Sequence, residues 1–363
     1  MRAIVLLFSL ILASCGEIFE PIPVPAEPKY STLEDAPKIV STFRSHVTFG
    51  LSGLAFLGTK LYVTSNIGLF EVQSGQPKFL YRWRDDHNVI RGPWQDKANG
   101  AVWLQRLEDM KFVRISASGW VREGLPSGSF TRGDFLRGFK IVSTNGEPRL
   151  VGAGEVWKWE SEGIWWRWRR QSEPPRPSDT ATVAYAKLLD GEIQVRTNDC
   201  FTEPCAYTAY RLRGDKWEKP IRLPFKSVSG IQNAVVVSDE LFLLGDGDRL
   251  VQVKDDGVRE FSTPGPTEAI AITSKGKLLA SFRGMGVYEF DNGWKQRVSS
   301  PYGPEEGEHF AYLAEENGSI AFATSQMPQL RSASRNEWEY TGTTALWISK
   351  SDKFTRVRLM PNR

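Results

Sequence analysis

The chain has 363 residues, of which 25% are charged and 40% hydrophobic, and its formal net charge is +3 at pH 7. A charge this close to zero gives no general attraction to nucleic acid, so we expect no nucleic-acid partner. Beyond the first residues, no apolar stretch has the length that a membrane-spanning helix needs. The composition therefore predicts a folded domain with at most one membrane attachment, near the N-terminus.

The first residues have the pattern of an export signal. Arg2 gives a positive start, residues 3–12 form an apolar run, and the small residues of "LASCG" (12–16) follow. The run is too short to span a membrane and suits a cleavable signal peptide. Leu-Ala-Ser-Cys resembles the lipobox of bacterial lipoproteins, which implies that residues 1–14 are removed and that Cys15 carries a diacylglycerol. The alternative is an ordinary secretory signal with a chance cysteine.

Residues 15–38 follow as a tether. Four prolines between positions 21 and 28 fix φ and favour an extended polyproline II spacer, and an excess of acidic residues keeps it solvated. We expect it to hold a folded domain, residues 39–363, off the lipid surface. Under the sorting rules of the lipoprotein family, Gly16 after the cysteine implies the outer membrane, and we expect the domain to face the periplasm.

The domain consists of repeats of short strands. Residues 51–83 contain four β-branched and aromatic runs separated by turn residues, and 230–263 and 267–299 repeat the same order at nearly the same length. A looser version of the pattern occurs in 98–124, 135–171, 181–223 and 309–359. Four strands in roughly 40–50 residues, repeated about seven times, is the period of a β-propeller.

The motif "LYVTSNIGLFEV", echoed by "LLASFRGMGVYEF", resembles the repeats of bacterial periplasmic propellers, including those of two-component sensor ectodomains. The resemblance covers most of the chain after the tether. It implies an all-β propeller of about seven four-stranded blades, with six or eight blades, a β-sandwich or two barrels as alternatives. Either 38–45 or 354–360 supplies the outer strand where the ring closes.

Two cysteines remain after Cys15. They are Cys200 and Cys205 in "NDCFTEPCAY". In an oxidising periplasm they can pair across four intervening residues and close a small loop. We expect this disulfide, with two free thiols as the alternative.

Groups that perform chemistry are not arranged in any motif that we recognise. His46, His87 and His309 are far apart in sequence and form no metal-binding pattern, and no nucleophile elbow or phosphate loop is present. Asp246 and Asp248 could offer oxygens to calcium, but a tight turn explains them better. The paired carboxylates at 85–86, 255–256 and 305–306 are typical of solvated turns. We therefore expect no catalytic residue, metal or cofactor.

The long loops of the predicted blades gather on one face. In a propeller, the loops between second and third strands share a face with the connections between blades, and loops on a rigid scaffold often carry binding residues. The long segments are 84–97, 197–207, 299–310 and 324–344. Trp, Tyr and Arg dominate protein-binding hot spots, and a histidine joins them here. The candidate partner-binding residues are His87, Arg91, Trp94, Tyr302, Arg331, Arg335, Trp338 and Tyr340.

A tryptophan-rich segment, "EVWKWESEGIWWRWRRQ" (155–171), is a separate candidate surface. In the repeat pattern it forms the third and outermost strands of the third blade, and alternation places large aromatic residues on both faces. Blades pack through both faces, so we interpret the segment as a seam between blades rather than as a binding surface.

These observations predict a lipid-anchored envelope propeller that binds another protein and catalyses no reaction. A glycan or peptidoglycan binder that uses loop aromatics for stacking is the first alternative. A propeller enzyme, such as a lyase, a hydrolase or a quinone-dependent dehydrogenase, is the second, because propellers host many activities.

Overall fold

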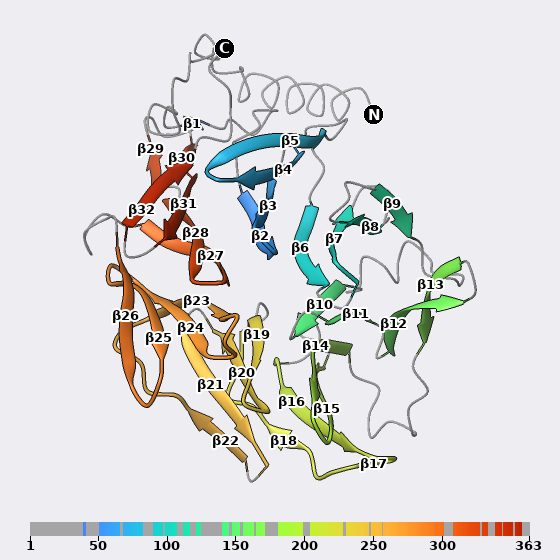
Figure 1. Ribbon diagram of the computed structural model, residues 1–363. Coiled ribbons are helices and arrows are strands. Elements are labelled where there is room, and N and C mark those ends of the chain that lie inside the picture. The colour runs from blue at the N-terminus through green and yellow to red at the C-terminus, as the bar shows by residue number, and fades with distance from the viewer. Residues whose placement is uncertain are drawn as a thin grey trace, which may run out of the picture.

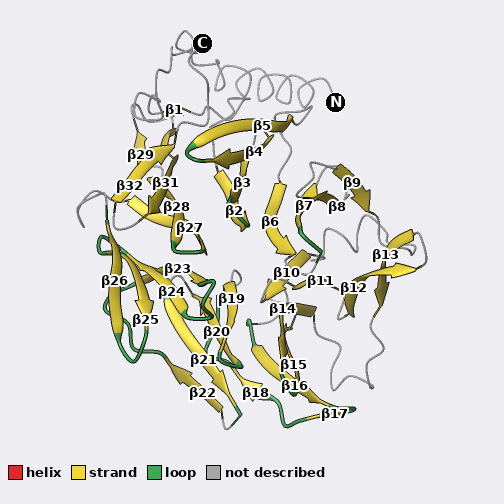
Figure 2. Cartoon of the chain, in the orientation of Figure 1, coloured by secondary structure: helices red, strands yellow, loops and turns green. Residues whose placement is uncertain are grey.

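The computed structural model describes Ile39–Val40 and most of the chain from position 51 to position 357. The described residues are 39–40, 51–65, 68–82, 90–96, 99–106, 112–116, 121–124, 140–144, 147–152, 155–162, 165–170, 181–198, 204–227, 230–246, 248–255, 257–300, 308–326, 329–332, 338–342, 344–350 and 353–357. Every regular element in these ranges is a β-strand (Figure 2). Among them there is no helix with the length and hydrophobicity to cross a membrane.

Seven antiparallel sheets follow one another along the described chain, and we number them 1 to 7. Sheets 1 to 3 consist of β2 (Leu51–Leu57), β3 (Lys60–Ser65), β4 (Gly68–Gln73) and β5 (Gln76–Arg82); of β6 (Ile90–Asp96), β7 (Ala101–Arg106), β8 (Phe112–Ser116) and β9 (Val121–Gly124); and of β10 (Lys140–Thr144), β11 (Glu147–Gly152), β12 (Glu155–Glu162) and β13 (Trp165–Arg170). Sheets 4 and 5 consist of β14 (Ala181–Leu188), β15 (Gly191–Thr197), β16 (Tyr207–Arg213), β17 (Lys216–Trp217) and β18 (Ile221–Arg222); and of β19 (Ile231–Val237), β20 (Glu240–Gly245), β21 (Arg249–Lys254) and β22 (Gly257–Glu260). Sheets 6 and 7 consist of β23 (Thr267–Ile272), β24 (Leu278–Phe282), β25 (Gly286–Phe290) and β26 (Trp294–Ser299); and of β27 (Glu308–Glu316), β28 (Ser319–Gln326), β31 (Thr344–Lys350) and β32 (Lys353–Val357).

The sheets are arranged in a ring, with the first strand of each sheet towards the centre (Figure 1). Successive inner strands contact each other, and β2 also contacts β27, so the last sheet meets the first. This arrangement confirms the predicted all-β propeller. The described sheets fit the expected number of seven blades.

Tight hairpins connect the inner two strands of several sheets. Glu316 pairs with Ser319, so β27 and β28 are joined by Asn317 and Gly318 alone, with φ angles of 52° and 81°. Positive φ at both central residues defines the type I′ turn, whose twist matches the twist of the flanking strands. Asn and Gly adopt this conformation at little cost, which explains why these two residues follow the strand.

The hydrophobic core lies between sheets, not in one central cluster. In sheet 1, one set of alternate residues packs against sheet 2 and the other set packs against sheet 7, as the period of a strand requires. The first set is Ala55, Tyr62 and Leu69. The second set includes Leu54, Val63 and Phe70. Sheet 1 is therefore buried on both faces, and apolar clusters likewise lie between sheets 4 and 5, 5 and 6, and 6 and 7.

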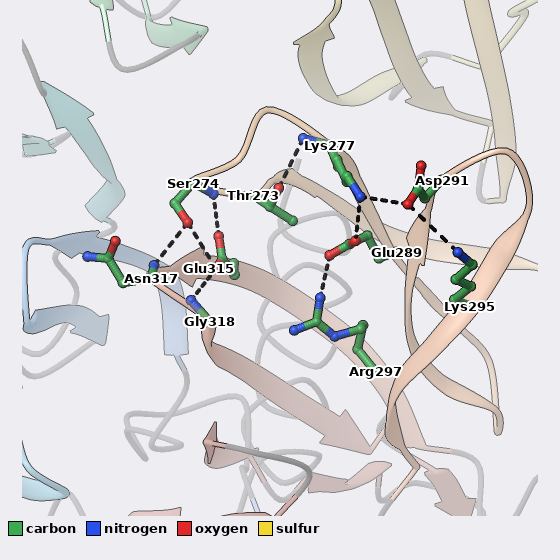
Figure 3. A network of polar contacts seen from close by, with 10 residues as sticks. All are labelled: Thr273, Ser274, Lys277, Glu289, Asp291, Lys295, Arg297, Glu315, Asn317 and Gly318. Atoms are coloured by element: carbon green, nitrogen blue, oxygen red, sulfur yellow. Dashed lines mark hydrogen bonds and ion pairs between the residues drawn. The ribbon is translucent and has the colours of Figure 1, made fainter.

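The contact between sheets 6 and 7 is reinforced by polar groups at one end of the seam (Figure 3). Glu315, near the end of β27, accepts hydrogen bonds from the backbone N–H of Ser274 and, at 2.6 Å, from that of Gly318. The Ser274 hydroxyl accepts the N–H of Asn317 at 3.1 Å. One carboxylate thus joins the β23–β24 turn of sheet 6 to the β27–β28 turn of sheet 7.

Sheet 7 contains an insertion that forms an eighth, separate sheet. β29 (Gln329–Ser332) and β30 (Trp338–Gly342) lie between β28 and β31 in sequence, and β30 also pairs with β1 (Ile39–Val40). The expectation of one long loop at 324–344 was therefore wrong for these residues. β32 is the outer strand of sheet 7, and Ile39–Val40 pairs with the insertion instead. Of the two alternatives for the outer strand, the structure has the C-terminal one.

Candidate binding face

The two faces of the ring differ in the length of their chain connections. We call turn face the one formed by the hairpins that join the first strand of a sheet to the second and the third to the fourth, whose described residues are 58–59, 74–75, 99–100, 189–190, 214–215, 238–239, 255, 273–277, 291–293 and 317–318. We call connection face the opposite one, whose described residues are 198, 204–206, 223–227, 230, 246, 248, 261–266, 283–285 and 300. The strands that border the longest connections, such as β5 and β6, β9 and β10, and β13 and β14, end and begin at the connection face, as do β28 and β31 on either side of the insertion of sheet 7.

A bulge recurs where the inner strands start, at the connection face. In six inner strands, two residues oppose one residue of the neighbouring strand near this end, whereas the described residues of β10 keep a continuous register. The inserted position is Ser52, Val183, Gln232, Glu268 or Ala311 in five of these strands, and in β6 Gly92 and Pro93 together oppose Leu104. Bulges redirect side chains and are common beside functional sites. Each of these blades therefore presents one residue out of alternation around the centre of the ring.

Glu268, at the bulge of β23, is the charged member of this set. Its side chain is only 4% exposed, and Oε1 accepts a hydrogen bond from Arg283 Nε at 2.8 Å. Oε2 accepts the backbone N–H of Phe310 in β27 at 2.9 Å. The carboxylate therefore connects sheets 6 and 7 at the connection face, opposite the Glu315 contacts of the turn face. A buried carboxylate needs such partners because an unpaired buried charge is costly.

Arg283 lies in the short turn between β24 and β25. Its N–H donates to Pro266 O at 3.0 Å, and the N–H of Met285 donates to Phe282 O at 3.0 Å, so the turn is closed at both sides. Gly284 has a φ of 67°, which glycine adopts without strain. The Arg283 side chain is 46% exposed although its Nε is held by Glu268. This arginine is both fixed and accessible.

The corresponding turn of sheet 5 uses its charged residue differently. Asp246 occupies the place of Arg283, since its N–H donates to Gly230 O at 2.9 Å just before the inner strand. Its carboxylate accepts the backbone N–H groups of Lys226 and Ser227 at 2.8 and 3.0 Å. Asp246 thus fastens the connection between sheets 4 and 5, which supports the interpretation of this segment as a turn rather than a calcium loop.

Tyr207 supports the same connection from sheet 4. Its hydroxyl donates to Ser227 O at 2.8 Å, and its ring fills the space where Gly230 has no side chain. Burial raises the pKa of Tyr207. Nearby, Arg249 is paired with Glu260 at 3.3 Å and donates to Pro224 O at 3.1 Å, and the bond to Glu260 raises the pKa of the guanidinium.

Side chains also satisfy backbone groups between neighbouring inner strands. Gln95 donates to Phe56 O, from sheet 2 to sheet 1, and Asn233 donates to Ile270 O at 2.7 Å, from sheet 5 to sheet 6. The inner edge of a sheet exposes unpaired carbonyl oxygens, so these amides replace a missing strand. Gln232, next to Asn233, is exposed at the bulge, and its side chain makes no hydrogen bond among the described residues.

Some candidate residues lie in strands and not in loops. The segment 84–97 was expected to be a loop, but Ile90–Asp96 is the inner strand β6, so Arg91 and Trp94 belong to sheet 2. Trp94 is half-buried and pairs with Trp103 across the hairpin. Assigning Trp94 to a loop surface was therefore wrong.

The insertion holds three more candidates within strands. Arg331 lies in β29 opposite Glu339, and Trp338 and Tyr340 lie in β30 opposite Ser332 and Leu330. His87, Tyr302 and Arg335 lie outside the described residues. The structure does not bring the eight candidates together as one described site.

The predicted disulfide loop is closed at its base by Asn198. The side-chain amide donates to Pro204 O at 2.9 Å, and Oδ1 accepts the N–H of Ala206 at 2.7 Å. Cys205 packs against the core between sheets 4 and 5. Cys200 lies outside the described residues, as does the lipidation candidate Cys15, so both assignments stay predictions.

The tryptophan-rich segment belongs to the scaffold where its side chains are described. β12 and β13 are the third and outermost strands of sheet 3, as expected. Trp157 and Trp159 are buried, and the Trp159 ring meets that of Trp103 in sheet 2 edge to face at 4.8 Å. This contact confirms the interpretation as a seam for β12. The side chains of β13 lie outside the described set.

Sequence reasoning missed the Glu268–Arg283 pair. A carboxylate inside the otherwise apolar run "TEAIAI" was the available signal, but its partner becomes visible only with the register of β23 and β24. Within the described ranges, no three His, Cys, Asp or Glu residues form a group that could hold a metal ion.

No protein-family model matches the chain. No curated protein matches its sequence either. Solved structures do match. Virginiamycin B lyase from Staphylococcus aureus aligns with a TM-score of 0.53 and 14% identity over 79% of this chain and 95% of that one.

Two further solved structures have different roles. PorZ, a surface component of the type-IX secretion system of Porphyromonas gingivalis, aligns with a TM-score of 0.51 and 12% identity over 86% of this chain and 38% of that one. YCF48 bound to D1 peptide aligns with a TM-score of 0.50 and 9% identity over 86% of this chain and 95% of that one. At these identities the likeness shows the β-propeller fold alone.

Proposed function

We propose that the protein is a lipid-anchored envelope propeller that binds another protein through its connection face and catalyses no reaction. The observation that carries the proposal is the one-sided distribution of the chain connections. Rigid sheets with hairpin turns on one face and long segments on the other are the usual design of a loop-based binding surface. The lipobox and the likeness of the repeats to periplasmic propellers support the envelope location.

The polar groups at the start of the inner strands also favour binding over catalysis. The Glu268 carboxylate already accepts hydrogen bonds from Arg283 and from Phe310 N–H, and the Asp246 carboxylate holds Lys226 and Ser227. General acid–base chemistry needs a carboxyl group that reaches the substrate. Among the solved structures, YCF48 is bound to a peptide and PorZ is a secretion-system component. Other proteins with this fold therefore bind a peptide or belong to a surface assembly.

Site-specific photo-cross-linking in the native cells tests the binding face. Lys226 and Pro264 are exposed on the connection face, and Lys275 and Asn292 are exposed on the turn face as matched controls. We expect a photoreactive residue at the first two positions to cross-link one defined protein, and the controls to give none. Cross-links from the turn face alone, or saturable binding of the purified chain to sacculi with no protein cross-link, would contradict the proposal.

Lipid anchoring has its own test. Cys15→Ala removes the thiol that the lipobox resemblance assigns to lipidation, so we expect the variant to lose labelling by a lipid precursor and to leave the membrane fraction. Cys205→Ala serves as the control and should remain membrane-bound. Unchanged labelling of Cys15→Ala would overturn the assignment.

A further inference from the structure

The guanidinium of Arg283 is hydrogen-bonded through Nε, and its two terminal nitrogens are available to a ligand. Nε donates to Glu268 Oε1 at 2.8 Å, while Nη1 and Nη2 have no hydrogen-bond partner among the described residues. The Arg283 side chain is 46% exposed at the connection face. An arginine offers its donors as a planar fork that fits an anion with two oxygens.

The anchor itself is rigid. Glu268 is 4% exposed and is held by Phe310 N–H from the next sheet, and the backbone of Arg283 is held by Pro266 O. Holding a long side chain in one geometry before binding reduces the conformational entropy that is lost on binding. The arrangement therefore prepares the fork for a ligand.

The scaffold does not need the terminal nitrogens of Arg283. In sheet 5, the equivalent Asp246 uses both carboxylate oxygens to fasten the preceding connection. On the same face, Arg249 uses Nε and Nη2 for Glu260 and Nη1 for Pro224 O. Of the two arginines, Arg283 keeps terminal donors free of partners among the described residues, whereas Arg249 does not.

We propose that Arg283 binds a carboxylate group of the protein partner, and that Glu268 is its positioning residue. The assignment to a protein partner rests on the proposed function. The negative charge of Glu268 beside Arg283 disfavours a phosphate dianion more than a singly charged carboxylate. Gln232, at the equivalent bulge of the adjacent inner strand, offers an exposed amide on the same side of the ring.

A titration of the purified full chain, labelled with ¹⁵N-arginine, tests this binding without the partner. The probes are N-acetylglycine, which carries a carboxylate, and N-acetylglycinamide and inorganic phosphate as comparisons. We expect saturable shifts of the Arg283 side-chain resonances with N-acetylglycine, none with the amide, and weaker binding of phosphate. Absence of saturable shifts, or phosphate binding as tight as carboxylate binding, would overturn the proposal.

Variants separate recognition from folding. Arg283→Lys keeps the charge but loses the fork, so we expect the affinity for N-acetylglycine to fall about tenfold; because this variant lacks the Arg283 resonance, the affinity is read from backbone amide shifts of residues 284–285 in uniformly ¹⁵N-labelled protein. Glu268→Gln retains an acceptor for Phe310 N–H but loses the charged anchor, and we expect a loss of about threefold together with altered Arg283 resonances. Arg249 is already bound to Glu260 and Pro224 O, so Arg249→Gln should change neither the affinity for N-acetylglycine nor the Arg283 resonances. Equal losses in Arg249→Gln and Arg283→Lys would show a general effect of charge and contradict the assignment.

A second Arg283 variant, Arg283→Gln, connects binding of the probe to binding of the partner. If N-acetylglycine binds at Arg283 and Arg283→Gln abolishes the cross-links from the connection face, the proposal holds. If the probe binds and the cross-links persist in Arg283→Gln, the partner does not use this arginine, and that part of the inference is wrong. Absence of any cross-linked protein in the wild type would contradict the proposed function, whereas the titration still reports on Arg283.

Discussion

Gly53 lies where the inner strands of sheets 1 and 2 come together. A Cβ atom at this position would overlap the carbonyl oxygen of Gly92, which already accepts a hydrogen bond from Thr64 Oγ1 at 2.6 Å. The obstacle is backbone, so it cannot move aside as a flexible side chain can. Glycine at position 53 is therefore a packing requirement between two blades.

We expect Gly53→Ala to lower the free energy of unfolding by about 3 kcal/mol, at the upper end of the range for overpacked sites. Gly265→Ala is the control, because its Cβ would meet only the flexible Met285 side chain and its φ is not positive. The control should change stability by less than about 0.5 kcal/mol. Thermal unfolding followed by circular dichroism checks both, and equal midpoints for the two variants would contradict the close approach.

Two buried tyrosines make stability depend on alkaline pH. The Tyr62 hydroxyl donates to Glu71 at 3.1 Å and that of Tyr185 to Glu192 at 2.8 Å, and burial first, then the neighbouring carboxylate, raises the pKa of each phenol. A raised pKa in the folded state means that the unfolded chain loses these protons first. The stabilising effect is therefore complete below the ordinary pKa of about 10 and declines as the pH rises above it.

The Tyr62→Phe/Tyr185→Phe double variant should reduce this alkaline destabilisation. Thermal midpoints measured from pH 8 to pH 11 should fall less steeply for the double variant than for the wild type. Tyr288→Phe, at a partly buried position in sheet 6, is the control. Parallel curves for the wild type and the double variant would show that these phenols ionise in the folded protein.

At the scale of elements, the repeats made most strands predictable. Runs such as Lys60–Ser65 and Leu278–Phe282 are buried almost without interruption, because both faces of their blades pack against neighbouring sheets. β6 is harder to recognise in the sequence, since its Gly92–Pro93 pair has the composition of a turn. In the structure this pair occupies the bulge of an inner edge strand, where a residue without an N–H removes no ladder bond.

Other elements could not be deduced from local sequence. β29 and β30 are defined by pairing with each other and with Ile39–Val40, about three hundred positions away along the chain. The Glu268–Arg283 pair likewise depends on the register between two strands. Such features depend on tertiary contacts, which neither periodicity nor residue type reports.

The Glu315 contacts give a prediction for one pair of turns (Figure 3). Glu315→Ala leaves the N–H groups of Ser274 and Gly318 without their carboxylate acceptor, a change similar to the loss of a helix cap. We expect a loss of about 1 kcal/mol and faster hydrogen exchange at both amides. Glu260→Ala, which breaks only the exposed pair with Arg249, should leave that exchange unchanged. Unaltered exchange in Glu315→Ala would exclude a role for this carboxylate in joining sheets 6 and 7.

At the scale of the whole molecule, the ring closes where sheet 7 meets sheet 1. These two sheets are not consecutive in sequence, so no inter-sheet connection joins them. Sheets 1 and 7 are built from opposite ends of the domain, and neither contributes a strand to the other. The residues that join them are apolar and include Val63, Ala321 and Val357. Within the described part of the chain, β1 paired with β30 is the one backbone ladder between the N-terminal segment and sheet 7 or its insertion. The closing seam therefore depends on side-chain packing more than the other seams do.

A matched pair of substitutions tests whether this seam opens by itself. Val357 lies in β32 against sheet 1, and Val298 lies in β26 against sheet 7; their exposed fractions are 1% and 3%. Each change to alanine removes the same two methyl groups and should cost about 1–3 kcal/mol. The inter-sheet connection still joins sheets 6 and 7 in Val298→Ala, so we expect amide exchange to increase uniformly as global stability falls. In Val357→Ala we expect a larger increase in amide exchange that is confined to β2, β3, β31 and β32. Sheets 1 and 7 are not consecutive in sequence, so they can separate locally while the other seams stay closed. The same exchange pattern in both variants would mean that the ring unfolds as one unit and that its closure is no weaker than its other seams.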